Sequence, residues 1–318
     1  MSFQPGTSNR TAIRLAKETV FNTIPTSPAF QNMRYTGETI AYAVNTVTSS
    51  EIRADRMTSD LIVVGASVSG DVNFELSYGS FDTILEAAMA STWGAPGVGG
   101  ASSMKNGVVA HSFTLQKHFQ DLATPYFQNF SGCRIGTLNL DFQTGAILTG
   151  SFNVMGCQAT QGPTQIAGAT FTNPGEGNTP MNAVANVASI SKDGVPMAAK
   201  IRSTSFALTN NLRGQEAIGT LGYIGIALGR LEITGNIELY FENADEYTTF
   251  LNNQDFEFTF VVRDVDGNEY EFSMPRVKYE SGTIQSGGLD QDLVISGSWR
   301  ALYDPTAGCM IEITRTPA

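Results

Sequence analysis

The sequence is poor in the residues from which active sites and metal centres are usually built. Its 318 residues include two histidines, His111 and His118. They lie seven positions apart and would fall on opposite faces of a strand, so we expect both at the surface. There is neither a G-x-S-x-G elbow nor a P-loop, and no nucleophile, base and orienting group can be assembled. We therefore predict that the protein is not an enzyme and needs no cofactor or metal ion.

Long apolar runs and paired cysteines are missing as well. No run approaches the roughly 18 residues that a membrane-spanning helix needs, which predicts no membrane insertion. The three cysteines, Cys133, Cys157 and Cys309, are widely spaced and form no CxxC pair. We interpret them as buried or half-buried thiols of a reducing compartment.

Positive charge is scarce. The chain has 19 Lys and Arg against 30 Asp and Glu, a net charge of −11, and residues 158–318 hold 19 of the acidic side chains. Because binding nucleic acid needs clustered Lys and Arg, the charge argues against a nucleic-acid-binding protein. The 32 glycines and a charged fraction of only 15% favour short strands and turns over long helices.

One stretch shows a strand that passes into a helix. Between residues 68 and 78 apolar or small residues alternate with polar ones, which predicts a strand with one buried face. The spacing then becomes that of a helical stripe, with Ser80 as the expected N-cap. Residues 233–251 repeat this pattern after a shift of 165 (233 − 68), and there Asn243 and Glu246 stand at capping-box spacing.

Two further pairs of segments recur in the same order: SSEIR (49–53) with TNNLR (209–213), and LTGSFNV (148–154) with ISGSWRA (295–301). Three matches in one order predict an internal duplication; chance similarity of two β domains is the alternative. We expect a mainly β protein with two tandem antiparallel β-sandwich domains, each with its own core and a short flanking helix. The expected divisions are an extended N-terminal arm (1–35), a first domain (36–157), a linker or loop (158–180) and a second domain (181–318).

Glycines indicate turns and loops inside these divisions. Asp193-Gly194 and Asp266-Gly267 predict β-hairpin turns. The Gly-rich stretch 91–107 predicts a long surface loop in the first domain.

Four segments carry a resemblance to a known family: ETVFNTIPTSPAFQNMRYTGETI (18–40), SSEIRADRMTSDLIVVGASVSGDVNFELSYGSFDTILEAAM (49–89), HSFTLQKHFQD (111–121) and FALTNNL (206–212). Together they resemble the tail tube (major tail) proteins of long-tailed, siphovirus-type bacteriophages. The resemblance covers most of the chain and is strongest over residues 18–155. It implies a structural virion protein with a β-sandwich fold and a flanking helix, here of a variety with a duplicated domain.

The resemblance also implies how such a protein works. Tail tube proteins stack as rings into a hollow tube through which the genome leaves the virion. Many carry one domain per chain and form six-membered rings, so a chain with two domains is expected to close a homotrimeric ring with pseudo-sixfold symmetry. The expected partners are further copies, the tape measure protein and the terminator protein, while DNA passes through the lumen without specific binding. The expected location is the virion tail, after assembly in the host bacterial cytoplasm.

Two sets of residues are candidates for these roles. A wall poor in Lys and Arg suits the passage of a polyanion, and the polar faces of the two repeated strands could form it. The candidate lumen residues are Asp71, Asn73, Glu75, Asn236, Glu238 and Glu242. Extended charged segments, together with the N-terminal arm, suit contacts between rings or subunits. The candidate contact residues are Glu51, Arg53, Asp55, Arg56, Arg213 and Glu216. The alternatives are a solvated or neighbour-packing face for the first set and a solvated loop for the second.

Other classes of function stay open at this point. A carbohydrate- or protein-binding β-sandwich module predicts an aromatic platform, whereas Trp93 and Trp299 are far apart in the sequence. Another virion component, such as a tail terminator or a decoration protein, is a further possibility.

Overall fold

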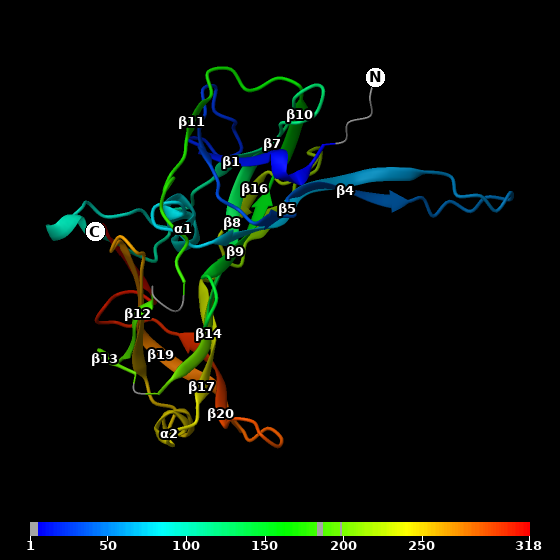
Figure 1. Ribbon diagram of the computed structural model, residues 1–318. Coiled ribbons are helices and arrows are strands. Elements are labelled where there is room, and N and C mark those ends of the chain that lie inside the picture. Colours follow the sequence, from blue (N-terminus) through cyan, green and yellow to red (C-terminus); the bar gives the residue numbers. More distant parts are fainter. Residues whose placement is uncertain (1–5, 183–186, 198) are drawn as a thin grey trace.

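The chain forms two β-rich halves, which lie one above the other in Figure 1, and each half carries one short helix. The computed structural model describes residues 6–182, 187–197 and 199–318. Among the strands described, β2 and β11 pair in parallel and the other pairs are antiparallel. The predicted mainly β, antiparallel class is confirmed.

The first half is built from two sheets that share one long strand, β8. One sheet has the order β4-β5-β9-β8, and β3 precedes β4 along the same edge of β5. The other has the order β2-β1-β7-β8-β10. The strands up to the second half are β1 (Thr11–Lys17), β2 (Ala29–Asn32), β3 (Gly37–Glu38), β4 (Ala41–Thr48), β5 (Leu61–Glu75), β6 (Ser102–Lys105), β7 (Phe113–Phe119), β8 (Tyr126–Gln143), β9 (Thr149–Gly156), β10 (Gln158–Gly162) and β11 (Thr170–Thr172).

The second half repeats this pairing order. One sheet is β14-β17-β20-β19, and the other is β13-β12-β18-β19-β21, so the long strand β19 takes the place of β8. The strands of this half are β12 (Val187–Lys192), β13 (Val195–Pro196), β14 (Ile201–Thr209), β15 (Arg213–Gln215), β16 (Gly225–Ala227), β17 (Glu232–Tyr240), β18 (Phe256–Arg263), β19 (Glu269–Gln285), β20 (Val294–Ala301) and β21 (Glu312–Thr316).

The long strands β8 and β19 each serve two sheets. Their N-terminal parts pair in one sheet and their C-terminal parts in the other. Near the point where each strand passes from one sheet to the other, one residue has no partner in the neighbouring strand. This residue is Gly136 in β8, opposite β9, and Glu280 in β19, opposite β20. An extra residue of this kind bends a strand and increases its twist, which is what a strand shared by two sheets requires.

One sheet runs through both halves. β8 pairs with β14 over seven residues, from Thr137↔Thr209 to Gln143↔Ser203. This junction, which we call the internal seam, joins two four-stranded sheets into one of eight strands in the order β4-β5-β9-β8-β14-β17-β20-β19. We call these eight strands the continuous sheet.

A helix follows the same strand in each half, as the change of hydrophobic period predicts. Helix α1 (Asp82–Met89) comes after β5 and packs on β8, and α2 (Asp245–Leu251) comes after β17 and packs on β19. The residues of α1 that are buried lie mainly at helical spacing on one face: Ile84, Leu85, Ala87, Ala88 and Met89.

The helix caps differ in part from the prediction. Phe81, not Ser80, occupies the N-cap position of α1. The Ser80 hydroxyl instead accepts a hydrogen bond from the hydroxyl of Ser77 (2.8 Å). Before α2, Asn243 Oδ1 does accept the N–H of Asp245 (3.0 Å). Glu246 closes no capping box and binds Lys192 (2.8 Å).

The predicted hairpin turns are present. Asp193 and Gly194, both with positive φ, join β12 to β13. Asp266 and Gly267 lie in the turn between β18 and β19.

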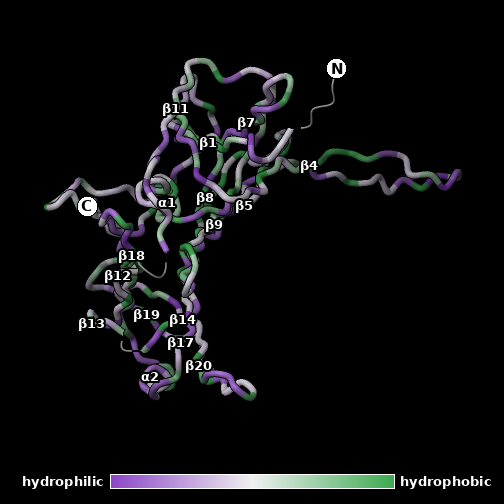
Figure 2. Tube along the Cα trace, viewed as in Figure 1, coloured by the Kyte–Doolittle hydropathy of each residue, from purple (hydrophilic) through white to green (hydrophobic). Residues whose placement is uncertain are grey.

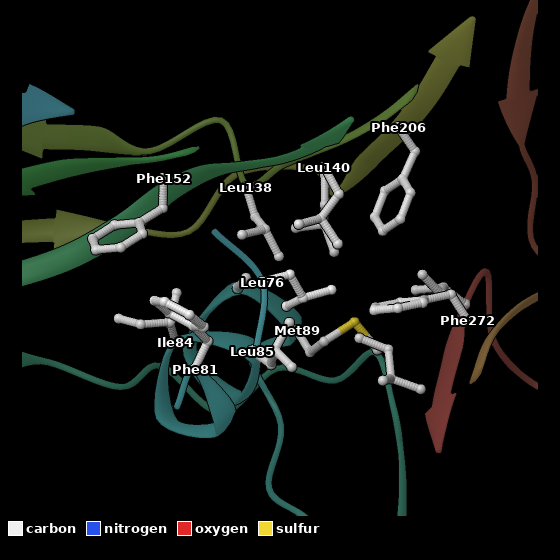
Figure 3. Close-up of a cluster of buried hydrophobic side chains, with 14 of the residues drawn as sticks. Leu76, Phe81, Ile84, Leu85, Met89, Leu138, Leu140, Phe152, Phe206 and Phe272 are labelled. Carbon is white, nitrogen blue, oxygen red and sulfur yellow. The ribbon is translucent and has the colours of Figure 1, made fainter. Parts of the chain in front are cut away.

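The buried side chains of the two halves form one cluster (Figure 3). Met89 of α1 and Leu140 of β8 point toward Phe206 of β14 and Phe272 of β19, which belong to the second half. The rings of Phe206 and Phe272 are 5.4 Å apart. The halves therefore share a core, whereas the sequence predicted a separate core for each.

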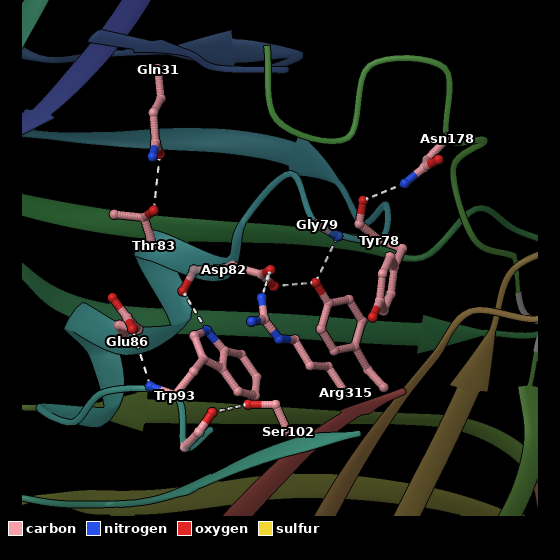
Figure 4. Close-up of polar contacts among 12 residues, drawn as sticks. Gln31, Tyr78, Gly79, Asp82, Thr83, Glu86, Trp93, Ser102, Asn178 and Arg315 are labelled. Carbon is pink, nitrogen blue, oxygen red and sulfur yellow. Dashed lines mark hydrogen bonds and ion pairs between the residues drawn. The ribbon is translucent and has the colours of Figure 1, made fainter. Parts of the chain in front are cut away.

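A polar cluster also ties the halves together (Figure 4). Asp82, at the start of α1, accepts a hydrogen bond from Tyr270 of β19 (2.5 Å) and pairs with Arg315 of β21. The Tyr270 hydroxyl accepts the N–H of Gly79 (2.9 Å), and the Arg315 guanidinium lies 4.6 Å from the centre of the Trp93 ring. Burial, together with the charge of Asp82, raises the pKa of Tyr270 well above its ordinary value, so it remains a neutral donor.

Three segments expected outside the sheets contribute strands to them. In the expected loop 91–107, β6 pairs with β21 of the second half. The expected arm 1–35 contains β1 and β2, and its residues 1–5 lie outside the described residues. The expected linker 158–180 contains β10 and β11. Strands as short as β2, β6, β10 and β11 leave too few alternating positions for a clear periodic signal.

The strand ladders show which residues of the two halves correspond. Gly70 pairs with Val154, and Gly235, at the predicted shift of 165, pairs with Trp299. Val154 is therefore the counterpart of Trp299. The predicted match of LTGSFNV with ISGSWRA, which aligns Phe152 with Trp299, is two residues out of register.

The third predicted match is also out of register. Ala43 pairs with Ser67, which lies three places before Gly70. Thr209 pairs with Glu232, which lies three places before Gly235. Ala43 is therefore the counterpart of Thr209, and Ser49, which the match of SSEIR with TNNLR proposed, is not.

Candidate assembly surfaces

One face of the continuous sheet is mostly polar. Five of the six residues predicted to face a lumen lie on it: Asp71, Asn73, Glu75, Asn236 and Glu238. The residues between them in β5 and β17 are buried. Glu242 lies outside the strand, because β17 ends at Tyr240 and Glu242 follows in the turn before α2.

The polar face continues across the internal seam. One row of directly paired residues crosses seven strands from β5 to β19, and all its members are polar: Glu75, Thr149, Asp141, Ser205, Asn236, Ser298 and Ser281. Side chains on this face bond to each other, as Asn139 Nδ2 does to Ser151 Oγ (3.0 Å). A hollow of about 780 Å³ lies over β8, β14, β17, β20 and β19. The sheet thus presents hydroxyl, amide and carboxylate groups across both halves.

Carboxylates hold the arginines on or beside this face. Arg300 of β20 pairs with Glu280 and lies 4.0 Å from Glu232, and Arg202 pairs with Glu238 (3.1 Å). The hydrogen bond to Glu280 raises the pKa of Arg300. With Arg300 and Arg202 paired and with further carboxylates on it, the face offers little attraction to a polyanion.

The continuous sheet ends in two strands with a free edge. Within the described residues, β4 pairs only with β5, and residues 278–285 of β19 pair only with β20. An open edge presents a row of unpaired N–H and C=O groups and invites pairing with another chain. Since β4 is eight residues long and as many residues of β19 are free, neither edge is protected by being short.

A long hairpin extends away from the first half (Figure 1). We call it the arm; it consists of β4, the turn after it and the start of β5, residues 41–65. The tip of the arm carries four of the predicted contact residues, all exposed: Glu51, Arg53, Asp55 and Arg56. The hydrogen bond from Arg53 lowers the pKa of Asp55, its partner at 2.6 Å.

The arm also exposes apolar side chains, which the charged tip did not indicate. Between 47% and 99% of each is exposed: Val44, Val47, Ile52, Met57, Leu61, Ile62, Val63 and Val64. Figure 2 shows hydrophobic stretches along the arm and a hydrophilic tip. The run LIVV (61–64) could have been noticed in the sequence, but such a run normally predicts a buried strand. A two-stranded ribbon cannot bury both its faces, so these residues mark a surface for a partner.

The second half has a matching hairpin, formed by β15 and β16. It pairs Arg213 with Ala227, as the arm pairs Val47 with Ile62 at the corresponding places. The last two predicted contact residues, Arg213 and Glu216, are exposed on this hairpin. The structure thus places the six predicted contact residues on two corresponding hairpins.

Unlike the arm, the β15–β16 hairpin lies against the rest of the chain. Ile226 is 2% exposed, and its carbonyl oxygen accepts a hydrogen bond from Arg134 of β8. In the turn, a Cβ at Gly222 would lie 2.8 Å from the carbonyl oxygen of Cys157. Glycine is needed there because the turn approaches the first half closely and has a positive φ.

The described part of the chain can also be compared with the requirements of a metal site and of a membrane span. No group of three or more His, Cys, Asp or Glu in it suits a metal ion, and none of its helices is long and apolar enough to cross a membrane. His111, expected at the surface, is buried and bonds to the carbonyl oxygen of Ser91 (2.6 Å). What the fold does present is open sheet edges, an uncovered apolar arm and a wide polar face. These features define a structural β protein that joins other chains.

A comparison with protein families agrees with this class. The family model described as phage tail tube protein matches residues 8–301, so the chain belongs to the phage tail tube protein family. A search of curated proteins found no match. Membership makes the chain a structural protein of the virion tail, which assembles with other copies and with other tail proteins.

Proposed function

We propose that the protein forms the wall of a phage tail tube, in rings that stack around a bore through which DNA is ejected. The observation that carries this proposal is the continuous sheet, which has one polar face and two free edges. A sheet with free edges at both ends can continue from chain to chain, and a head-to-tail contact of this kind generates a ring when the rotation closes.

Three chains form each ring, and their two halves give it pseudo-sixfold symmetry. The shared pairing order of the halves supports this geometry and an internal duplication as its origin. Three continuous sheets of eight strands make a barrel of 24 strands. With strands about 4.8 Å apart and tilted by about 40°, such a barrel is about 50 Å across between backbones.

The polar face of the continuous sheet lines the bore. Asp71, Asn73 and Glu75 of one half and Asn236 and Glu238 of the other then face the passing DNA. Few free cations, and carboxylates in excess, allow a polyanion to slide without being held. Glu242, beyond the end of β17, is left at the rim of this surface.

The hairpin tips make contacts between rings or subunits. Their charged residues are Glu51, Arg53, Asp55, Arg56, Arg213 and Glu216, all exposed. The N-terminal segment takes part through the residues before β1, since β1 itself is in the sheet. Assembly takes place in the host bacterial cytoplasm, and the ends of the tube meet the tape measure and terminator proteins.

Electron microscopy of the purified full-length protein tests the proposal. The expected result is tubes or stacked rings with an open bore. Persistent monomers at high protein concentration would contradict it and favour a β-sandwich binding module instead.

A further inference from the structure

The arrangement of the two halves predicts how one chain meets the next. The counterparts on either side of the internal seam can be read from the strand ladders. Gly70 and Gly235 anchor the comparison, because both stand where two strands come unusually close. A Cβ at Gly70 would lie 2.4 Å from the Cα of Ile40, and one at Gly235 would lie 2.2 Å from the carbonyl oxygen of Ser205.

The free edge of the first half corresponds to β14. Ala41 faces Ser69, one place before Gly70, and Ala207 faces Thr234, one place before Gly235. Residues 39–43 are therefore the counterparts of residues 205–209, which form the β14 side of the internal seam.

The free edge of the second half corresponds to β8. The skipped residues Gly136 and Glu280 mark the same place in the two strands. Residues 281–285 of β19 are therefore the counterparts of residues 137–141, the β8 side of the internal seam. Each free edge of the chain thus has the same place in its half as one of the two strands that already pair inside the chain.

Taking the proposed ring as its basis, we propose that the internal seam is repeated between chains, with β19 of one copy pairing antiparallel with the β4 edge of the next. The register follows from the internal one, in which Asn139 faces Ala207. Between chains the facing pairs are Ser281 with Ala43, Gly282 with Tyr42, Thr283 with Ala41, Ile284 with Ile40 and Gln285 with Thr39.

The side chains at these positions suit the pairing. Thr283 and Ala41 lie on the polar face of the sheet, as Asn139 and Ala207 do in the internal seam. On the other face, Ile284 meets Ile40 where Leu140 meets Phe206 inside the chain. In the single chain the Ile40 N–H and carbonyl oxygen bond to the side chains of Glu38 (2.8 Å) and Lys117 (2.5 Å), so both groups change partners when the seam forms. Ile284 is 37% exposed in the single chain, so the contact covers an apolar side chain that is otherwise open.

The correspondence of the two halves also predicts where the arm lies on the neighbouring copy. Inside the chain, Asn210 donates its backbone N–H to Gly136 (2.8 Å) and its amide to the carbonyl oxygen of Ala88 in α1 (2.9 Å). The counterpart of Asn210 is Val44 of the arm, which therefore lies beside α2 of the neighbouring copy. There Leu251 is 63% exposed, so an apolar contact replaces the polar one. The rest of the arm covers the second half of the neighbour, as the β15–β16 hairpin covers the first half.

A designed disulfide tests the register. Thr39 donates its N–H to Asp71 in β5 (2.9 Å), so alternate residues, including Ala41, point their N–H groups toward β5. Ala41 and Thr283 would then form a non-hydrogen-bonded pair across the proposed seam, with Cα atoms about 4.5 Å apart. This distance is within the range of natural disulfides. The double variant Ala41→Cys/Thr283→Cys, assembled, oxidised and run on a denaturing gel without reductant, should give a ladder that ends at three chains.

Three controls make the result specific. Asn139→Cys/Ala207→Cys, the same pair at the internal seam, should form a disulfide within the single chain. Ala43→Cys/Thr283→Cys is two residues out of register and should give at least tenfold less cross-linked product. A mixture of the single variants Ala41→Cys and Thr283→Cys should give dimers only. If the first double variant fails to fold, Thr39→Cys/Gln285→Cys tests the next pair of the same kind.

The outcomes separate this inference from the proposed function. Tubes that form without the cross-link, or with equal cross-linking in the out-of-register control, would overturn the seam and leave the tube intact. Absence of any ring or tube in the unsubstituted protein would overturn both. A ladder in register that ends at six chains would support the seam and contradict the ring of three.

Discussion

The arm and the β15–β16 hairpin occupy the same place in their halves, yet one is open and the other is covered. Ile226 of the second hairpin is 2% exposed, whereas its counterpart in the arm, Leu61, is 60% exposed. The β15–β16 hairpin lies on the first half, which the same chain supplies. Among the residues that the structure describes, none outside the hairpin covers the arm in this way. The difference indicates that the exposed apolar residues of the arm become buried only when another copy packs against them.

The two junctions that follow from this comparison differ in strength. The internal seam is reinforced by the shared core and by the cluster of Asp82, Tyr270 and Arg315. At the seam proposed between chains, the contacts are strand pairing and the arm. One junction is therefore part of folding and the other part of assembly, and substitutions should be able to affect them separately.

The largest effect on assembly is expected from a proline on the open edge. Val44→Pro removes a backbone N–H that points away from β5. Its counterpart in the second half, Asn210, donates the same N–H across the internal seam to Gly136. The fraction of protein in tubes should fall by at least about tenfold, equivalent to about 1.4 kcal/mol, with monomer stability nearly unchanged. Sedimentation of assembled material and thermal unfolding of the monomer measure the two effects.

The neighbouring position provides the control. Ala43→Pro removes an N–H that points toward β5, so it should lower the stability of the monomer itself. Wild-type yields of tubes from Val44→Pro would show that this edge is not the site of assembly.

The next effect is on folding and not on assembly, and it is expected at the polar cluster that joins the two halves. Asp82→Ala leaves the buried Tyr270 hydroxyl and Arg315 without their acceptor, which should lower the free energy of unfolding by about 2–3 kcal/mol. Urea unfolding of the monomer measures it. Asp55→Ala, which breaks an exposed pair at the arm tip, is the control and should leave the free energy of unfolding nearly unchanged. Equal stability of the two variants would mean that the cluster does not hold the halves together.

Some of these features can be predicted from the sequence and others cannot, for physical reasons. The change from period two to helical spacing marks the passage from β5 to α1, because both elements have one buried face. The same alternation places Asp71 and Asn236 on the polar face. It does not mark where the strand ends, since the alternation continues to Glu242 whereas β17 ends at Tyr240. No local pattern shows that the LIVV run is exposed, because exposure depends on which surface lies opposite.

Strands formed by distant pairing were the hardest to predict. β6 is four residues long and exists through its ladder with β21, about 210 residues away in the chain. The exact correspondence of the halves was equally hidden, since Gly136 and Glu280 mark the same position without being similar. The pairing of β6 with β21 and the correspondence of Gly136 with Glu280 are seen only in the hydrogen-bonded strand pairs.

A change in the bore should affect transport while leaving assembly intact. Asp71→Lys with Glu238→Lys places unpaired cations on the polar face of both halves, so tubes should form normally but retain DNA, more strongly at low salt. Binding of duplex DNA by purified tubes, and the rate of ejection from virions, are the measurements. Glu51→Lys at the arm tip is the matched control for added charge. Failure of the double variant to assemble would mean that this face packs against a neighbour.

The smallest effect is expected from releasing an arginine already present. Glu280→Gln with Glu232→Gln removes both carboxylates from Arg300 without changing the size of either side chain. Arg230, which also pairs with Glu232, is freed together with Arg300. DNA retention by tubes should rise, but less than in the lysine variant, because the net charge of each chain rises by two in place of four. Glu269→Gln, which frees Arg263 on β18 outside the continuous sheet, should leave DNA retention unchanged. A similar rise in that variant would show that the effect is one of net charge only.

The most direct test is a three-dimensional reconstruction of the assembled tube by electron microscopy. The expected cross-section has three chains, whose continuous sheets join edge to edge into 24 strands around a bore about 50 Å wide between backbones. A ring of six chains, with the second half of each lying outside the wall, would contradict it.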